Sequence, residues 1–263
     1  MNGYLAILKM RMKTLLQYRT AAFAAVTTEF FWGLIMMMIY QAFFSSTTAK
    51  EPLSLSQSIT FLWLGQALIQ LLPWTIDKEL EAQIKNGNVA YELVRPVDLY
   101  AIWFARALAL RLIPTLMRCF PILILAGLFF GLEPPVSGQA GALFAISIIL
   151  ALFLSSAIST LVMVSLFWTI SGEGIQRLLP NISLLLSGLM VPLPLFPHWL
   201  QPFLSIQPFR GVLDIPCRIY TGVIPIDTAF YFLGFQLAWI CCFVWFGHKL
   251  MKKAARHFVI QGG

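Results

Sequence analysis

The chain has 263 residues, of which 59% are hydrophobic and only 11% are charged. Soluble globular domains carry about 25% charged residues, so this composition excludes a soluble fold and indicates an integral membrane protein. The net charge of +7 invites a nucleic-acid-binding interpretation, but the basic residues gather in alternate connections between apolar segments. That distribution is a topology signal rather than a nucleic-acid footprint.

Residues 1–20 do not form a cleavable signal peptide, because Lys9, Arg11 and Lys13 interrupt the apolar residues. As a helix, this segment has an apolar face beside a basic one, which is typical of a helix lying at the membrane interface. A plain cytoplasmic lead-in to the first span is the alternative. The residues themselves do not decide between the two.

Six apolar segments are long enough to cross a hydrocarbon core about 30 Å thick, which takes roughly 20 helical residues. Helices are predicted rather than a barrel, because the apolar runs show no two-residue alternation. The predicted spans are Ala21–Phe44, Ile59–Ile76, Leu112–Gly131, Ala140–Phe167, Gln176–Leu193 and Thr228–His248. Basic residues precede the first span, separate the second from the third and follow the sixth, so both termini are predicted to be cytoplasmic.

Two ionisable residues, Glu29 and Arg118, lie about two turns inside the first and third predicted spans. A charge within a membrane costs at least ~2.5–3.5 kcal/mol and usually has a partner. The two residues either pair with each other or line a polar path. Taken singly, we favour a simpler interpretation, in which Glu29 reaches toward the cytoplasmic interface and Arg118 bonds backbone carbonyls freed by Pro114 or Pro121.

The richest polar stretch, residues 76–98, connects the second and third predicted spans. Ile76–Lys85 is predicted to form a short amphipathic helix, because its apolar residues Leu80 and Ile84 recur at a spacing of four. Gly87 supplies a stop after it, and Arg95 precedes a proline that ends the next segment. This helix either transmits force from a soluble partner or belongs to a solvated loop whose charges only set the topology.

Residues 192–227 contain seven prolines among strongly apolar side chains such as Phe196 and Trp199. Prolines break any single long helix, so this outer region is predicted to form short re-entrant helices, which membranes tolerate where protein covers the backbone. An ordinary interfacial hairpin is the alternative. Met190, just before this region, offers a soft apolar surface that would suit varied substrates, although ordinary packing explains it equally well.

Two stretches carry recognisable patterns. The first has the pattern I-x-x-G … L-x-R-P … Y through Ile84, Gly87, Leu93, Arg95, Pro96 and Tyr100. The second, Ser187–Pro197 continuing to Gln207–Phe209, has the pattern S-G … P … F-P … P-F. Both resemble segments of the permease subunits of type-2 ATP-binding-cassette (ABC) exporters. With the six-span layout, the resemblance covers essentially the whole chain.

The resemblance implies an all-α integral membrane protein, with one permease domain over residues 1–263. Its parts would be an N-terminal interfacial elbow helix (1–20), six transmembrane helices, a cytoplasmic coupling helix (within 76–98) and outer re-entrant helices (192–227). Leu80 and Ile84 would seat in a groove of a cytosolic ATPase. The residues implied in ATPase coupling are Asp77, Glu79, Leu80, Glu81, Ile84, Gly87 and Arg95, the three acids serving as rim charges. Independently of the resemblance, the candidate residues of a substrate path are Glu29, Arg118, Met190 and Phe196.

The chain has no G-x-x-x-x-G-K-[ST] phosphate loop, no recognisable enzyme constellation, and no cysteine pattern that predicts a metal site or a disulfide. We therefore expect no cofactor on this chain, with ATP and Mg bound by a separate ATPase. The predicted function is the permease subunit of a bacterial inner-membrane exporter for an amphipathic drug, lipid or natural product, in a homo- or heterodimer of permeases. An ATP-independent secondary transporter or channel is the first alternative, and a membrane scaffold or sensor is the second.

Overall fold

The computed structural model describes residues 2–16, 19–46, 52–93, 97–169 and 172–257. Over these residues the fold is helical and contains no strand. The α-helices are α1 (Asn2–Leu15), α2 (Arg19–Ser46), α3 (Leu55–Leu68), α4 (Lys78–Lys85), α5 (Val89–Leu93), α6 (Leu99–Phe129), α7 (Gly138–Thr169), α8 (Glu173–Leu186), α9 (Gln201–Ile206), α10 (Asp214–Tyr220) and α11 (Ile226–His257). Three short 3₁₀ turns are η1 (Ile69–Leu71), η2 (Leu193–Leu195) and η3 (Pro208–Gly211).

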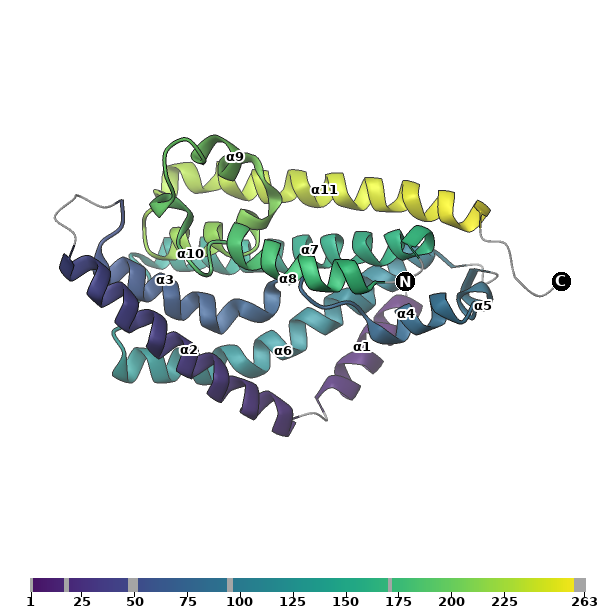
Figure 1. Ribbon diagram of the computed structural model, residues 1–263, viewed down its shortest axis with the longest axis horizontal. Helices are drawn as coiled ribbons and strands as arrows, with labels where there is room; N and C mark the ends of the chain where they lie inside the picture. Colours follow the sequence, from purple (N-terminus) through teal and green to yellow (C-terminus); the bar gives the residue numbers. More distant parts are fainter. Residues whose placement is uncertain (1, 17–18, 47–51, 94–96, 170–171, 258–263) are drawn as a thin grey trace.

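Among the described residues, four helices are long and apolar enough to cross a membrane: Ala24–Ser46 in α2, Leu99–Phe129, Gly138–Thr169 and Ile226–Ala255 in α11. They correspond to the first, third, fourth and sixth predicted spans, with ends that differ by two residues or more. Helices α6, α7 and α11 run along the long axis of the molecule, with α4 and α5 at one end and α9 and α10 at the other (Figure 1). We call these the proximal end and the distal end. The chain is thus an all-helical membrane protein.

The third predicted span begins thirteen residues too late, because α6 starts at Leu99 rather than Leu112. Asp98 caps the helix by accepting a hydrogen bond from the amide of Ala101 at 3.2 Å, which satisfies one of the free donors at a helix start. Arg106 and Arg111, which are among the basic residues between the second and third predicted spans, therefore lie inside this helix rather than in a connecting loop. Because both guanidinium groups bond to other side chains of the protein, their charges do not mark the beginning of the helix.

The second and fifth predicted spans correspond to α3 and α8, which have 14 residues each. Fourteen helical residues are about 21 Å long, less than the hydrocarbon thickness. Helix α3 continues only as far as η1, because Pro73 forces its predecessor Leu72 into an extended conformation (φ −62°, ψ 138°). Helix α8 ends just before Gly188, which has a positive φ of 83°.

The core lies around α3, where it packs against α7 and α10. Phe61 and Leu64 from α3 meet Leu154 from α7, together with Val212 and Leu213, which precede α10; none of the five exceeds 1% exposure. Burying a side chain of this size contributes about 1.5–3 kcal/mol. The core therefore attaches α10 to the long helices.

Helix α11 approaches α6 through Gly247, where a methyl group would collide with the ring of Tyr100. Gly234, on the same helix, has no atom within 4 Å of its would-be methyl position. We therefore expect Gly247→Ala to cost about 1–3 kcal/mol through overpacking. The matched change Gly234→Ala meets no neighbouring atom and should raise stability by up to about 1 kcal/mol, because alanine is the better helix former. Thermal inactivation in mild detergent, followed by size-exclusion chromatography, measures both; equal melting temperatures would contradict the close approach.

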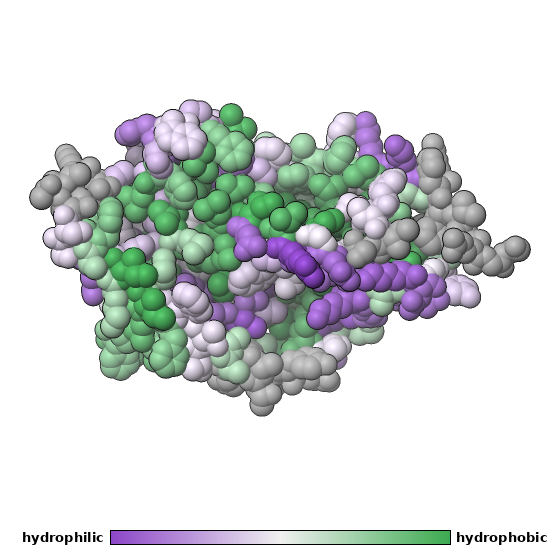
Figure 2. Space-filling model, in the orientation of Figure 1, coloured by the Kyte–Doolittle hydropathy of each residue, from purple (hydrophilic) through white to green (hydrophobic). Residues whose placement is uncertain are grey.

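The surface separates apolar from polar side chains. Figure 2 shows a largely hydrophobic face, with hydrophilic residues gathered over α4 and the beginning of α8. Large apolar side chains such as Phe31 and Trp32 on α2 and Ile124 and Leu128 on α6 are more than half exposed. A contiguous apolar surface of this kind suits contact with lipid rather than water.

Candidate functional site

The loop predicted to hold a coupling helix does contain one short amphipathic helix, α4. Asp77 is its N-cap, and one of its carboxylate oxygens accepts from the amides of Glu79 at 3.0 Å and Leu80 at 3.3 Å. The helix ends at Lys85, and Gly87 takes the positive φ of 74° that the predicted stop requires. Arg95 lies outside the described residues.

The apolar face of α4 points into the chain itself. Leu80 is 1% exposed and Ile84 is 8% exposed, and both pack in a cluster with Trp103 of α6 and Met163 of α7. In this conformation Leu80 and Ile84 are therefore covered by the chain's own helices and do not present a surface to an ATPase groove. Periodicity showed correctly that they share a face, but α6 and α7 cover that face.

Two of the acids predicted as rim charges link three helices. Arg106 of α6 donates from Nε to Asp77 Oδ2 at 2.9 Å and lies 3.2 Å from Glu79 Oε2. Glu79 also pairs with Arg11 of α1. Asp77 and Arg106 are about 10% exposed or less, whereas the Glu79 side chain is 53% exposed. These ion pairs join α1, α4 and α6, and only Glu79 keeps the exposed position expected of a rim charge.

Glu81, the third acid, is buried and connects α4 to the beginning of α8. Its carboxylate accepts from the amide of Gly172 at 3.2 Å and from Gln176 Nε2 at 2.7 Å, and it lies 3.1 Å from the ammonium of Lys85. Burial alone would raise the pKa of Glu81, but Lys85 and the other donors outweigh it and the pKa is lowered. A persistent negative charge therefore holds α8 to α4.

The two intramembrane charges are brought together by α2 and α6. Arg118 Nη1 lies 2.6 Å from Glu29 Oε1, and Gln70 of η1 donates to the same oxygen at 3.1 Å. The side chains of Glu29 and Arg118 are 9% and 20% exposed. Of the alternatives that the sequence left open, the structure shows the pair, and the separate interpretations that we favoured are wrong.

Met190 and Phe196, the other two predicted path residues, lie elsewhere. The carbonyl of Met190 accepts from the hydroxyl of Tyr40 at 3.1 Å, and Tyr40 follows Glu29 by eleven residues, about 16 Å along α2. Met190 is half exposed and Phe196 follows η2. The four predicted path residues therefore do not form one site.

Sequence reasoning missed a buried arginine at the proximal end. Arg111, 2% exposed, donates to the hydroxyl of Thr75 at 2.7 Å, to its carbonyl at 2.9 Å and to Ser159 Oγ at 2.8 Å. These bonds tie α6 and α7 to the residues just before α4. Arg111 falls just before the third predicted span, so sequence reasoning placed it in the connecting loop rather than inside α6.

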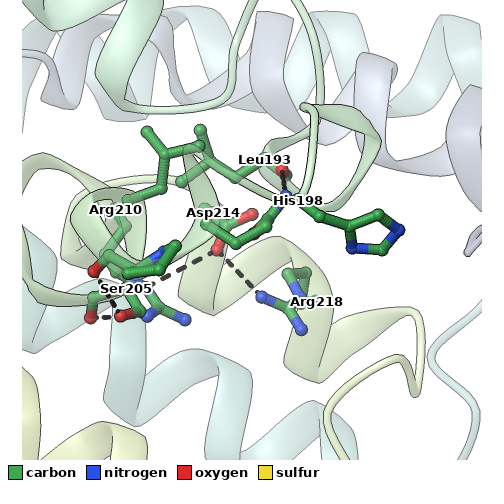
Figure 3. Close-up of a pocket in the computed structure, with 9 residues that line it drawn as sticks. Leu193, His198, Ser205, Arg210, Asp214 and Arg218 are labelled. Atoms are coloured by element: carbon green, nitrogen blue, oxygen red, sulfur yellow. Dashed lines mark hydrogen bonds and ion pairs between the residues drawn. The ribbon is translucent and has the colours of Figure 1, made fainter.

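A second missed cluster lines a pocket of about 370 Å³ at the distal end, which we call the α9–α10 pocket. Figure 3 shows Asp214 between Arg210 and Arg218, with Ser205 and His198 nearby. The carboxylate is fully buried, and Oδ2 lies 3.3 Å from Arg218 Nη1 and 3.9 Å from Arg210 Nε. The spacing of four residues between these charges was the available sequence signal.

Comparison with known protein families identifies the family of this chain. Residues 27–262 match the family model described as ABC-2 family transporter protein. The chain belongs to the ABC-2 transporter family. The match runs from α2 through the whole helical bundle, so it includes α4 and the distal pocket. No match to the chain was found among curated proteins or among solved structures.

Membership of the ABC-2 family makes this chain a membrane component of transport rather than a catalytic one. It also implies partnership with an ABC ATPase. Among the features described above, α4 has an exposed hydrophilic edge and is bonded to α1, α6 and α8 at once. It is therefore the candidate site for that partnership.

Proposed function

We propose that the chain is the permease subunit of an ABC exporter, forming with a second permease and two cytosolic ATPases a path for an amphipathic drug, lipid or natural product. The family match over residues 27–262 carries the proposal. ATP and Mg would bind to the partner ATPases. The second permease would be another copy of this chain or a related one.

In this proposal the whole chain is one permease domain in a bacterial plasma membrane, with both termini cytoplasmic. Helix α3 with η1, and α8 with the residues after it, would complete six crossings. The shortness of α3 is tolerable because protein surrounds it, as the burial of its residues from Phe61 to Leu68 indicates. Helix α1 would be the elbow helix, and the α9–α10 region would be re-entrant.

The ATPase would contact the exposed edge of α4, where Lys78, Glu79, Ala82, Lys85 and Gly87 are exposed. A force on this edge would be transmitted to α6 and α8 through hydrogen bonds and ion pairs. Asp77 and Glu79 pair with Arg106 in α6, and Glu81 accepts a hydrogen bond from Gln176 in α8. Because packed interfaces shift as units rather than deform, such a push could tilt these helices against one another.

The test is co-purification of an ABC ATPase with the tagged chain from its native membrane in mild detergent. Ala82→Asp places a bulky charge on the exposed edge and is expected to lower ATPase recovery at least about ten-fold, the effect of roughly 1.4 kcal/mol. The matched control, Ala255→Asp, makes the same change at an exposed position near the end of α11 and should leave recovery intact. Equal recovery with both variants would remove α4 from the docking surface.

One observation favours the alternative of an ATP-independent transporter: the pair of Glu29 and Arg118 inside a span, since intramembrane ionisable residues often serve ion pathways. Clean recovery of the chain without an ATPase, in detergent and again in nanodiscs, would support this alternative. Flux by that preparation would distinguish it from a scaffold or sensor.

A further inference from the structure

Two pockets at the distal end share one arginine. The α9–α10 pocket is lined by His198, Ser205, Arg210, Asp214 and Arg218. The second, of about 530 Å³, lies between the end of α10 and the beginning of α11 and is lined largely by Val223, Ile224, Pro225, Tyr231 and Phe232. Arg218 lines both. A charged compartment therefore adjoins an apolar one.

The charged compartment carries more positive charge than its one carboxylate can neutralise. Asp214 is the one acid among its lining residues, against two guanidinium groups, which leaves one positive charge in excess. Arg210 is 8% exposed, and two aromatic rings, Phe232 and Phe235, lie 5.3 and 5.5 Å from its guanidinium carbon. These rings and the bond from Nη1 to the carbonyl of Ser205 at 2.7 Å fix its position.

Two guanidinium donors here lack a hydrogen-bond partner. Within the described part of the chain, no acceptor bonds the buried Nε atoms of Arg210 and Arg218, whereas the carboxylate of Asp214 accepts from the amide of Leu193 besides its ion pairs. Burial raises the pKa of Asp214, against the opposing pull of Arg218 and Arg210. Buried donors without acceptors are costly, and a planar guanidinium is suited to bind a phosphate or carboxylate.

The apolar compartment indicates what such an anion would be attached to. Its lining side chains are mostly aliphatic or aromatic, and Tyr231 is 74% exposed at its edge. Asp227 also lines it and would repel a second anion, so a negative headgroup fits only the arginine side. Exposed Trp199 and Phe203 give the region the aromatic character of a membrane interface.

We propose that the two compartments form one site for an anionic amphiphile, with its phosphate or carboxylate headgroup at Arg210 and Arg218 and its apolar part in the apolar compartment between α10 and α11. The transport role of this site rests on the proposed function: in an exporter, the site would lie on the side where cargo is released, and the cargo would be negatively charged. The binding itself requires no ATPase.

The test is native mass spectrometry of the full-length chain in mild detergent with three probes. Dioctanoyl phosphatidylglycerol carries the anionic headgroup and apolar chains, glycerol phosphate the headgroup alone, and dioctanoyl phosphatidylcholine the chains with a zwitterionic headgroup. We expect the first to bind at least about ten-fold more tightly than either of the others, as one charged hydrogen bond and the buried chains allow.

Variants separate a binding role from a structural one. Arg218→Gln is expected to weaken phosphatidylglycerol binding about ten-fold, whereas Arg177→Gln, at an exposed position on α8, should leave it unchanged. Asp214→Asn removes the competing carboxylate and should tighten binding. Should Arg218→Gln alone fold poorly, the double variant Asp214→Asn with Arg218→Gln removes both members of the pair and should still bind less than Asp214→Asn.

Three results would overturn the proposal. Equal binding by the Arg218→Gln and Arg177→Gln variants would mean that lipid adheres without a site. Weakening by Asp214→Asn as strong as by Arg218→Gln would mean that the ion pair only holds the fold. Equal affinity for glycerol phosphate would indicate a site for a soluble anion. Loss of ATPase recovery bears on the proposed function alone, so the two proposals fail separately.

Discussion

Replacing Arg118 with glutamine is expected to destabilise the chain by about 3 kcal/mol, because removing one partner of a buried ion pair leaves the other charge uncompensated. Glu29, with a side chain 9% exposed, would lose its countercharge and keep only neutral hydrogen-bond donors such as Gln70. The free energy of unfolding, measured by titrating dodecyl sulfate into mixed micelles, gives the size of the loss. Arg177→Gln removes the same charge from an exposed position on α8 and should cost less than about 0.5 kcal/mol.

The double variant Glu29→Gln with Arg118→Gln shows whether the pair causes the loss. Two neutral amides can hydrogen-bond to each other and to Gln70, so the double variant should be more stable than Arg118→Gln alone. A double-mutant cycle should give a coupling energy of about 1–3 kcal/mol. Additive losses would mean that the two residues act separately, as in the interpretation that the sequence alone favoured.

The long helices were predictable because their signal is local. The absence of charged residues between Glu133 and Glu173, and between Asp227 and Lys249, indicated α7 and α11, since lipid admits few charges. The beginning of α6 was missed for the converse reason. Arg106 and Arg111 can lie inside a helix because they bond to Asp77 and Ser159. These partners come from other segments of the chain, so a local sequence pattern does not reveal them.

The candidate site separates in the same way into local and non-local features. The cap of α4 at Asp77 and the stop at Gly87 follow from residue type and position, and the structure has both. Helical periodicity shows that Leu80 and Ile84 share a face, but it does not show whether this chain's own helices or a partner cover that face, because that depends on tertiary packing. The pairing of Glu29 with Arg118 joins residues 89 positions apart, and such distances lie beyond any local pattern.

The orientation of α4 leads to the second large prediction: Leu80→Asp should destabilise the chain by about 4 kcal/mol or more. The change removes a buried leucine, worth about 2–5 kcal/mol when truncated. It also places a carboxylate in an apolar cluster beside Trp103 and Met163, where an unpaired charge is strongly disfavoured. The expected result is loss of monodisperse protein in size-exclusion chromatography, together with a lowered temperature of thermal inactivation.

Ala82→Asp is the matched control, because it adds the same carboxylate two residues away on the exposed edge of α4. It should keep the thermal stability of the parent chain and lose the ATPase, whereas Leu80→Asp should lose the ATPase only together with the fold. Leu80→Met conserves volume and should cost less than about 1.5 kcal/mol. A stable Leu80→Asp chain without its ATPase would mean that Leu80 faces the partner, and that α4 turns over between the free and assembled protein.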